Sequence, residues 1–555
     1  MRHSLIRYLG MTRPSRDPSL FFKYTGGRWF ENETWNQQQR TVKFDIDALK
    51  GAAISSVPGA KNVVKMTKLP EGAYNKVFSI ILDNQKEVVA RIPTPLAGPP
   101  QIVTASEVAT MKFARERLGV PVPRVLSWSS DSSATAVGAE FIIMEKAPGI
   151  EVGKVWHKLS MELRLRLVQA VVDIEHAALV SPLPSYGSIF FRDDIKPGVS
   201  SVAIDETYAI GPCMDRSFWN AERATMKIDR GPWSTTEQCL SAVFNREYQW
   251  ISQHASSQPL DAFRHHPAIT RDPAAHLAVL DMFKALIPHI IPTSPPEITQ
   301  STLWHHDLHG GNIFICESEL AEGRISISSV IDWQSTTAMP LYMQARVPQF
   351  FCYHSPWDLP SGVDKPVEPV RTEEMTDAEY KAAWEDWLAK QRVRGYRLFN
   401  MVSTPYYCDA LTDEKTLLFA ELVEAASTVW GRRFHMLRDR LALLYYSWSS
   451  LSSMPFPVPI TKDDVDSWYV VRREWEVRRD EMKELCRQIG IDTDGWCPAE
   501  DFDVTLQRYN ITKELWTEMG NAEADWPFSG PAADSGSKAG RLVRLFRKLY
   551  TSSST

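Results

Sequence analysis

Hydrophobic and polar residues follow two different periods along this chain. Short apolar runs at residues 87–92 and 140–144 lie next to turn-forming residues, which is typical of β-strands. From residue 161 onward the apolar positions recur with a helical period. We expect long helices at residues 161–179, 376–396, 415–446 and 463–489. The pattern therefore predicts an α+β protein in which a β-rich part precedes a larger helical part.

A short hairpin is predicted near the middle of the chain. Residues 313–315 and 325–331 are apolar, and the polar segment between them ends in Gly323, as a hairpin connection should. This hairpin would bring Asn312 and Asp332 to the same end of two adjacent strands. Amide and carboxylate oxygens are ligands that suit Mg²⁺, which usually keeps waters and substrate phosphates as its other ligands.

The segment before this hairpin has the residues that phosphoryl transfer needs. His305, Asp307 and Asn312 form the pattern H-x-D-x-x-x-x-N, and Asp332 follows twenty residues after Asn312. Phosphoryl transfer requires a carboxylate that orients the acceptor hydroxyl and takes its proton, together with ligands for magnesium. Asp307 fits the first role, and Asn312 and Asp332 fit the second. We expect His305 to complete the catalytic loop as a buried side chain that braces it.

A zinc site is the main alternative for the same segment. His305, His306 and His309 surround Asp307, and the first and last of them are four residues apart. Zinc-binding histidines at this spacing usually lie on a helix with a glutamate between them. The following Gly310-Gly311 argues against a helix here, so the magnesium-dependent interpretation is favoured.

Together these motifs resemble the aminoglycoside phosphotransferase and choline kinase-like family of small-molecule kinases. That family commonly shows H-G-D-L-H-x-x-N followed by a D-W pair, and this chain has residues 305–312 and Asp332-Trp333. The resemblance covers about residues 65–345. It implies a two-lobed protein-kinase-like fold that binds ATP and Mg²⁺ between its lobes and transfers the γ-phosphate to a hydroxyl of an unidentified small molecule.

A narrower resemblance covers most of the chain. Residues 22–29 (Phe-Lys-Tyr-Thr-Gly-Gly-Arg-Trp) and 216–219 (Arg-Ser-Phe-Trp) are similar to the fungal "altered inheritance of mitochondria protein 9" group. These motifs are less specific than the catalytic ones.

The family resemblance also assigns nucleotide-binding residues upstream of the catalytic loop. Gly72 and Asn75 match the nucleotide-covering hairpin of the family, in which Gly allows the backbone to approach phosphates. Glu145 and Ala147 match the hinge between the lobes, where backbone groups would bind the adenine edge. The Gly-x-x-Asn signal alone is weak because the same residues are common in ordinary turns.

A cation and a helix glutamate complete the expected nucleotide site. Arg91 stands on the predicted third strand where many kinases have Lys, so its phosphate contact would differ in reach and geometry. Glu107 begins a helical pattern with Val108 and Met111 on one face. We expect an ion pair between Arg91 and Glu107 that aligns the phosphates, although an exposed Glu107 is the simpler alternative.

Composition and charge narrow the class of protein. At 555 residues the chain is too long for one hydrophobic core. Its net charge of −6 gives no general attraction to nucleic acid, so no such partner is expected. The seven cysteines include no C-x-x-C pair, which argues against a disulfide framework and a zinc finger. No apolar run approaches the length that spans a membrane.

The chain divides into five expected parts. These are a targeting segment with an N-terminal arm (1–40), the small lobe (41–147), the core of the large lobe with the catalytic loop (148–345), a helical completion and extension (346–528), and a linker with a basic tail (529–555). Residues 1–16 contain four arginines and no acid, which fits a mitochondrial transit peptide. A cytoplasmic location is the alternative, because short basic starts also occur in cytosolic proteins.

Two segments have more than one interpretation. Residues 540–550 place apolar residues opposite arginines and lysine, so this basic helix could lie on an anionic membrane surface or dock on the protein. Residues 204–233, which include Arg216 and Trp219, form either a substrate-facing insertion or a surface packing loop.

The main rival to an active enzyme is a nucleotide-binding pseudokinase that acts as a mitochondrial scaffold or interaction protein. Arg91, the sparse glycine loop and the long helical extension allow this alternative. The presence of Asp307, Asn312 and Asp332 together argues against it. The acceptor and the oligomeric state are left open by the sequence.

Overall fold

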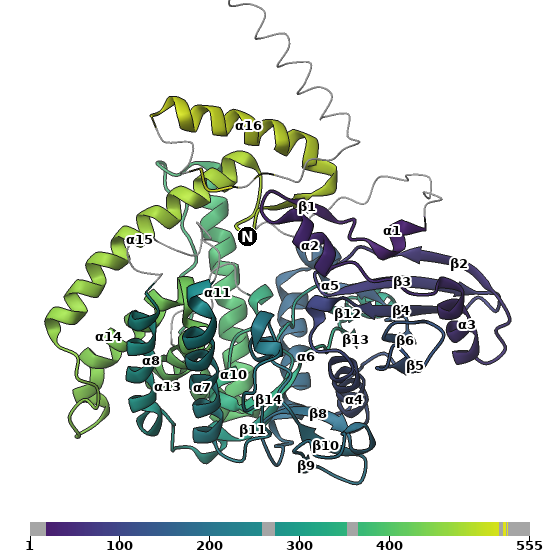
Figure 1. Ribbon diagram of the computed structural model, residues 1–555, viewed down its shortest axis with the longest axis horizontal. Coiled ribbons are helices and arrows are strands. Elements are labelled where there is room, and N and C mark those ends of the chain that lie inside the picture. Colours follow the sequence, from purple (N-terminus) through teal and green to yellow (C-terminus); the bar gives the residue numbers. More distant parts are fainter. Residues whose placement is uncertain (1–17, 258–271, 352–363, 521–525, 529, 531–555) are drawn as a thin grey trace, which may run out of the picture.

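The computed structural model describes residues 18–257, 272–351, 364–520, 526–528 and 530. The predicted targeting segment at 1–16 and the predicted basic helix at 540–550 lie outside these described residues. The described chain forms a small β-rich lobe, on the right in Figure 1, and a larger helical lobe on the left. This is the two-lobed, kinase-like α+β fold with a helical C-terminal extension that was expected from the sequence.

The small lobe is built on a five-stranded antiparallel sheet. In spatial order its strands are β2 (Val63–Lys68), β3 (Asn75–Leu82), β4 (Glu87–Pro93), β6 (Phe141–Glu145) and β5 (Val125–Ser129). Its two faces are covered by helices α3 (Ile46–Ser56) and α4 (Ile102–Glu116). On β6, Phe141 and Ile143 belong to the core that contains α3, whereas Ile142 and Met144 belong to the core that contains α4. The alternation follows from the period of two of a β-strand.

The same alternation places Arg91. Its neighbours on β4, Ala90 and Ile92, are buried in the core on the α3 side. Arg91 therefore points to the opposite face, which α4 covers and where Glu107 is only 2% exposed. A strand and a helix that the sequence predicts separately thus bring the two charged residues together.

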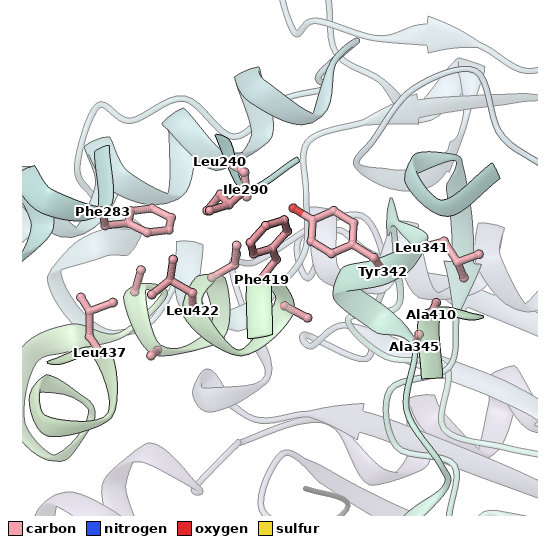
Figure 2. Close-up of a cluster of buried hydrophobic side chains, with 14 of the residues drawn as sticks. Leu240, Phe283, Ile290, Leu341, Tyr342, Ala345, Ala410, Phe419, Leu422 and Leu437 are labelled. Carbon is pink, nitrogen blue, oxygen red and sulfur yellow. The ribbon is translucent and has the colours of Figure 1, made fainter. Parts of the chain in front are cut away.

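The large lobe consists mainly of helices around one extended core. They are α5 (Val152–Val155), α6 (Met161–Leu179), α7 (Thr236–His254), α8 (Pro273–Leu286), α10 (Leu341–Gln344), α11 (Asp377–Ser403), α12 (Pro405–Thr412), α13 (Glu414–Ala426) and α14 (Phe434–Leu451). Figure 2 shows side chains from several of these helices meeting in the core, including Leu240, Phe283, Leu341, Phe419 and Leu437. Full burial of such side chains contributes about 1.5–3 kcal/mol each. None of the helices in the described part of the chain could cross a membrane.

Short sheets in the large lobe position the catalytic segment. They are formed by β11 (Ser301–Trp304) with β14 (Thr337–Pro340), by β13 (Ile327–Val330), β12 (Ile313–Ile315) and β7 (Ile150–Glu151), and by β8 (Ser188–Phe191), β10 (Tyr208–Gly211) and β9 (Val202–Ala203). The antiparallel pairing of β12 with β13 confirms the predicted hairpin. Its connection contains the short helix α9 (Glu317–Ala321), which the sequence reading did not anticipate.

Helix boundaries in the C-terminal part agree with the periodic pattern except at one place. α11 and the long helix α15 (Lys462–Ile489) both begin at capping boxes, formed by Thr376 with Glu379 and by Thr461 with Asp464. The single helix expected at 415–446 is wrong. It is divided into α13 and α14 by a turn and a π-helical segment, Val429–Arg433. This interruption contains Gly431 and follows Ser427, and both residue types are weaker helix formers than Ala or Leu.

The N-terminal arm is attached to the C-terminal extension. The arm contains α1 (Ser19–Phe22), β1 (Gly27–Trp29) and α2 (Glu33–Gln39), and the extension ends with β15 (Trp496–Pro498) and α16 (Phe502–Glu518). β1 pairs antiparallel with β15. Phe30, which follows β1, is buried with Phe502 and Tyr509 of α16. The arm and the extension therefore form one body above the two lobes (Figure 1).

Candidate active site

The catalytic loop begins at His305, directly after β11. The Nε2 atom of His305 lies 2.9 Å from the carbonyl oxygen of Ile331. A carbonyl can only accept, so the imidazole donates this hydrogen bond from Nε2. Burial lowers the pKa of His305, and its ring packs edge-on against Trp333. His305 thus fastens the loop to the strand end that leads to Asp332, which is the bracing position expected for it.

Asp307 is the most accessible carboxylate of the loop. Its side chain is 66% exposed and lies 3.6 Å from Nε2 of His309. The imidazole lowers the pKa of Asp307, and Asp307 in turn raises the pKa of His309. The backbone N–H of Gly311 donates to Nδ1 of His309 at 2.9 Å, which orients the ring. Asp307 is therefore ionised at neutral pH and open to a ligand.

The hairpin brings Asn312 and Asp332 close together, as predicted. The N–H of Ile331, which precedes Asp332, donates to the carbonyl oxygen of Asn312 at 3.0 Å. The side-chain amide of Asn312 donates to the carbonyl oxygen of Asp307 at 2.9 Å, which turns its own oxygen away from the loop. Asp332 has a φ of 66°, a left-handed conformation that Asp adopts more readily than most residues. Two side chains with oxygens of the kind that Mg²⁺ prefers thus stand at one edge of the hairpin.

Arg91 connects the small lobe to this edge. Its guanidinium pairs with Glu107 in a short contact, so the expected ion pair is present. The same guanidinium also donates to Oδ1 of Asp332 at 2.6 Å. Burial raises the pKa of Glu107 to about 7, and Arg91 opposes this shift. The contact with Asp332 was not expected from the sequence, and it means that a metal at Asp332 would share this carboxylate with Arg91 or displace it.

The glycine loop also reaches the large lobe. The side-chain amide of Asn75 donates to Oε1 of Gln334 at 3.1 Å. A Cβ atom added to Gly72 would meet nothing within 4 Å, so the protein itself gives no steric reason for glycine here. The loop is held by Glu71, which pairs with Lys68 at 2.9 Å and Lys76 at 2.7 Å. Its conformation is thus fixed by buried charges and by the contact of Asn75 with Gln334 across the lobes.

One cation from residues 204–233 lies in the same region. The guanidinium of Arg216 is stacked over the ring of Tyr74 in the glycine loop, 3.4 Å from its centroid. Its charge opposes the rise that burial causes in the pKa of Glu107, and it adds to the lowering of the pKa of Asp307 by His309. Trp219 is turned the other way and donates from its indole to the carbonyl oxygen of Cys213 at 2.8 Å. The segment therefore packs through Trp219 and places Arg216 against the glycine loop, whereas a substrate-facing role stays a prediction.

The sequence model of the Phosphotransferase enzyme family matches residues 65–343. The chain belongs to this family. The match begins in β2 and ends in α10, so it includes the small-lobe sheet, the catalytic loop and the hairpin.

Relatives of this phosphotransferase-family chain cover nearly its whole length. A subtelomeric hrmA-associated cluster protein of Aspergillus fumigatus is 28% identical over 495 residues, 83% of this chain and 95% of that protein. The protein called "altered inheritance of mitochondria protein 9, mitochondrial" of Yarrowia lipolytica is 23% identical over 533 residues, 88% of this chain and 86% of that protein. The narrower resemblance to that fungal group is confirmed.

Solved structures of small-molecule kinases and phosphotransferases are similar to this chain at a lower level. A Ralstonia eutropha protein, provisionally described as an aminoglycoside phosphotransferase, has 14% identity and a TM-score of 0.38, with 79% of this chain and 98% of that one covered. A choline kinase from Cryptosporidium parvum has 11% identity and a TM-score of 0.29, with 73% of this chain and 96% of that one covered. The lobes and the site described above therefore rest on the geometry of this chain itself.

Fewer backbone groups than expected are free to bind adenine at the hinge of this phosphotransferase-family chain. The backbone N–H of Glu145 donates to the carbonyl oxygen of Arg124 at 2.9 Å. The N–H of Arg124 lies 3.2 Å from the Glu145 carboxylate. The Glu145 N–H is therefore not the group that would bind an adenine edge, and the expected contact moves to other backbone groups up to Ala147.

The zinc alternative receives no support from the geometry. His305, His306 and His309 have three different partners, which are the carbonyl oxygen of Ile331, the hydroxyl of Thr337 at 2.8 Å and the carboxylate of Asp307. Across the described ranges, no group of three or more His, Cys, Asp and Glu side chains could hold a metal ion.

Two residues of the site were missed by sequence reasoning. Gln334 follows Asp332-Trp333 directly, and Tyr74 precedes Asn75, so both stand next to recognised motifs. Adjacency to a motif was the only available signal, because their partners come from the opposite lobe.

Proposed function

We propose that this chain is an ATP- and Mg²⁺-dependent phosphotransferase that transfers the γ-phosphate to a hydroxyl of a small molecule. The observation that carries this proposal is the convergence of Asp307, Asn312 and Asp332 on one edge of the hairpin, facing the Arg91–Glu107 pair of the small lobe. Membership of the phosphotransferase enzyme family supports the same reaction class.

The residues fit the metal and the nucleotide. The side-chain oxygens of Asn312 and Asp332 would hold Mg²⁺, which prefers such hard oxygen ligands. When bound, the metal neutralises charge on the phosphates. Arg91, held by Glu107, would contact the phosphates from the small lobe. Its guanidinium can release Asp332 and bind a phosphate instead, because a carboxylate and a phosphate both accept charge-assisted hydrogen bonds from arginine.

Asp307 would act on the acceptor. Its lowered pKa makes it a weak general base. Its main contribution would therefore be to accept a hydrogen bond from the acceptor hydroxyl and so aim that oxygen at the phosphate. The proton would pass to Asp307 only as the new bond forms.

A pseudokinase scaffold is the second candidate, and one observation favours it. Arg91 already binds Asp332 at 2.6 Å. If this pair persisted when nucleotide was present, the carboxylate would be less available to a metal. The chain would then bind nucleotide without Mg²⁺, or would not bind it.

The thermal midpoint with and without Mg-ATP tests the proposal. A ligand that binds only the native state raises stability, by about 2.7 kcal/mol at one hundred times its Kd. We expect a magnesium-dependent rise for the wild type that is lost in Asp332→Ala. The rise should remain in Asp307→Asn, because Asp307 serves the acceptor and not the nucleotide. No rise in the wild type, or a rise without magnesium, would favour the scaffold.

The names of several relatives support a mitochondrial location for this chain as part of the proposal. Fluorescence imaging of the chain fused at its C-terminus would test it, with and without residues 1–16. We expect mitochondrial signal that depends on these residues. A diffuse signal from the full chain would contradict the proposal.

A further inference from the structure

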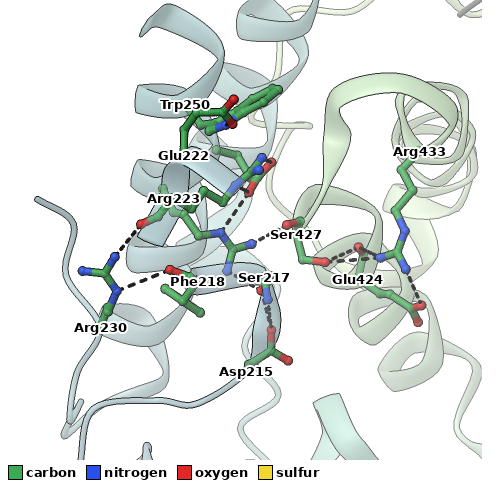
Figure 3. Close-up of polar contacts among 12 residues, drawn as sticks. Asp215, Ser217, Phe218, Glu222, Arg223, Arg230, Trp250, Glu424, Ser427 and Arg433 are labelled. Carbon is green, nitrogen blue, oxygen red and sulfur yellow. Dashed lines mark hydrogen bonds and ion pairs between the residues drawn. The ribbon is translucent and has the colours of Figure 1, made fainter. Parts of the chain in front are cut away.

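The segment that carries Arg216 is held in place by the large lobe. It contains the short 3₁₀ helix η4 (Arg216–Phe218), between β10 and α7. The backbone N–H of Ser217 donates to Asp215 at 2.8 Å, which caps this turn. Figure 3 shows Asp215, Ser217 and Phe218 beside a group of charged side chains from the neighbouring helices.

A buried arginine fixes the middle of this turn. Arg246 of α7 is 1% exposed and donates to the hydroxyl of Ser217 at 2.7 Å. It also donates to the carbonyl oxygen of Ser427 in a short contact, and its guanidinium lies 4.2 Å from the centroid of the Phe218 ring. Two helices, α7 and α13, thus determine where η4 lies.

A second set of contacts fixes the chain that follows. Arg223 pairs with Glu247 of α7 at 2.9 Å. Arg230 donates to the carbonyl oxygens of Phe218 and Arg223, and its guanidinium lies 4.0 Å from the centroid of the Trp219 ring. Figure 3 shows Arg223, Arg230 and Phe218 within one network of polar contacts. A side chain that projects from such a support is held more precisely than one on a mobile surface loop.

Arg216 is the cation that projects from this support, and it has no carboxylate of its own. Among the residues that the structure describes, it makes no ion pair, and its Nε atom is buried without a hydrogen-bond partner. Its guanidinium carbon lies 3.4 Å from the centroid of the Tyr74 ring. Keeping a partly buried guanidinium unpaired is unfavourable unless an anion compensates it. Arg216 therefore has both the position and the spare donors to bind an anionic ligand.

The surroundings of Arg216 identify where that anion would be. Its positive charge favours the ionised forms of two carboxyl groups, Asp307, which would face the acceptor, and Glu107, which holds Arg91. It also covers Tyr74 in the loop expected to close over the phosphates. A group that lies between these three landmarks would be the last phosphate of the nucleotide, because Arg91 serves the phosphates from the small-lobe side.

We propose that Arg216 binds the γ-phosphate of the nucleotide, so that residues 213–230 form a fixed large-lobe wall against the transferring phosphoryl group. This inference rests on the proposed function. The planar guanidinium of arginine can place two N–H donors on two phosphate oxygens, which a lysine ammonium cannot do in the same geometry. Tyr74 would keep the guanidinium in place by stacking, and so links the glycine loop to the presence of a third phosphate.

Comparison of a triphosphate with a diphosphate tests Arg216 without knowledge of the acceptor. Calorimetry would measure the affinities of Mg-AMP-PNP and Mg-ADP for the wild type, Arg216→Ala and Arg216→Lys. We expect Arg216→Ala to weaken Mg-AMP-PNP about 10- to 100-fold, the usual range for a charge-assisted hydrogen-bond pair, and Mg-ADP by less than about twofold. Arg216→Lys should fall between the wild type and Arg216→Ala.

Two further variants separate binding from folding. Arg117→Ala is the matched control, because Arg117 also stacks near a tyrosine, Tyr208, but pairs with Asp205 away from the site. It should change neither affinity. Tyr74→Leu keeps Arg216 and should weaken Mg-AMP-PNP selectively, by a smaller factor than Arg216→Ala. The thermal midpoint of each ligand-free variant would show that the fold is retained.

The possible outcomes are distinct. Selective loss of Mg-AMP-PNP binding in Arg216→Ala supports the inference. Equal loss of both nucleotides, or loss of neither, overturns it while leaving the proposed phosphotransferase intact. Failure of the wild type to bind either nucleotide overturns both. If Arg216→Ala does not fold, unchanged triphosphate preference in Arg216→Lys and Tyr74→Leu overturns the inference.

Discussion

Two buried glutamates in this protein are each paired with arginine, but their networks end differently. Glu247 in the large lobe is fully buried and lies 2.9 Å from both Arg223 and Arg246. Glu107 in the small lobe is 2% exposed and, among the residues that the structure describes, forms its ion pair with Arg91, whose guanidinium also contacts Asp332. The side chain of Asp332 is 40% exposed. The first network is closed within the protein, whereas the second ends at a carboxylate that a ligand can reach.

This difference teaches how to separate structural from functional ion pairs. Burial and a charged partner are common to both clusters, so neither property identifies a site. The distinguishing feature is an end that is open to a ligand, next to further groups with perturbed pKa such as Asp307 and His309. The closed cluster supports η4, whereas the open one joins the small lobe to Asp332.

Breaking the closed cluster should have the largest effect on stability. Glu247→Ala would leave Arg223 and Arg246 buried without their carboxylate. We expect the free energy of unfolding to fall by about 3–5 kcal/mol, measured by urea denaturation.

The exposed Glu237, on the same helix, provides the control. Glu237→Ala should lower the free energy of unfolding by less than about 1 kcal/mol. A loss for Glu247→Ala no larger than this would mean that the closed cluster does not stabilise the fold.

A third buried glutamate, Glu175, extends the comparison because it should make the stability of the fold depend on pH. Glu175 of α6 has no arginine and accepts a hydrogen bond from the Tyr396 hydroxyl at 2.6 Å. Burial raises its pKa from 4.5 to about 8. Between these values the folded protein holds a proton that the unfolded chain releases, so Glu175 makes stability fall as pH rises across this window. The slope contributed is at most about 1.4 kcal/mol per pH unit.

Urea midpoints between pH 5 and pH 9 would test this contribution, with Glu175→Gln as the comparison. Glutamine keeps the acceptor for Tyr396 but cannot ionise, so the variant should lose this part of the pH dependence. It should be more stable than the wild type at the alkaline end. Parallel pH curves for the two proteins would show that Glu175 titrates normally in the fold.

The open cluster should respond mainly through ligand binding. Glu107→Gln removes the charge that holds Arg91 but keeps a hydrogen-bond acceptor, and Asp332 still pairs with Arg91. We expect Mg-ATP affinity to fall about tenfold, equivalent to about 1.4 kcal/mol, as measured by calorimetry. Unfolding in urea should change less than for Glu247→Ala. The reverse order of effects on stability would remove the distinction between the two clusters.

The sequence predicts those parts of the site that depend on the residue spacing within one strand or helix, or on the pairing of two neighbouring strands. Asn312 and Asp332 flank a short hairpin, so strand pairing alone brings them together. Arg91 and Glu107 follow from a strand period of two and a helix that covers the same face. The roles of these residues, and those of Gly72, Asn75 and Ala147, stay predictions until nucleotide binding is measured.

The parts that the sequence could not predict depend on how the lobes and extensions meet. Asn75 and Gln334 are 259 positions apart, and the contact of Arg216 with Tyr74 also joins opposite lobes. Periodicity within one element contains no information about such contacts. The break between α13 and α14 was missed for a related reason, because apolar positions continue with helical spacing through a segment whose residues form helix only weakly.

The pairing of β1 with β15 has a consequence for the order in which this molecule is completed. Residues Gly27–Trp29 are synthesised well before their partners Trp496–Pro498. At about 5–20 residues per second the delay is on the order of tens of seconds. For that time the strand has an unpaired edge, which is open to wrong partners. β1 is thus made early in the described part of the chain but pairs only after β15, late in the described part, has been synthesised.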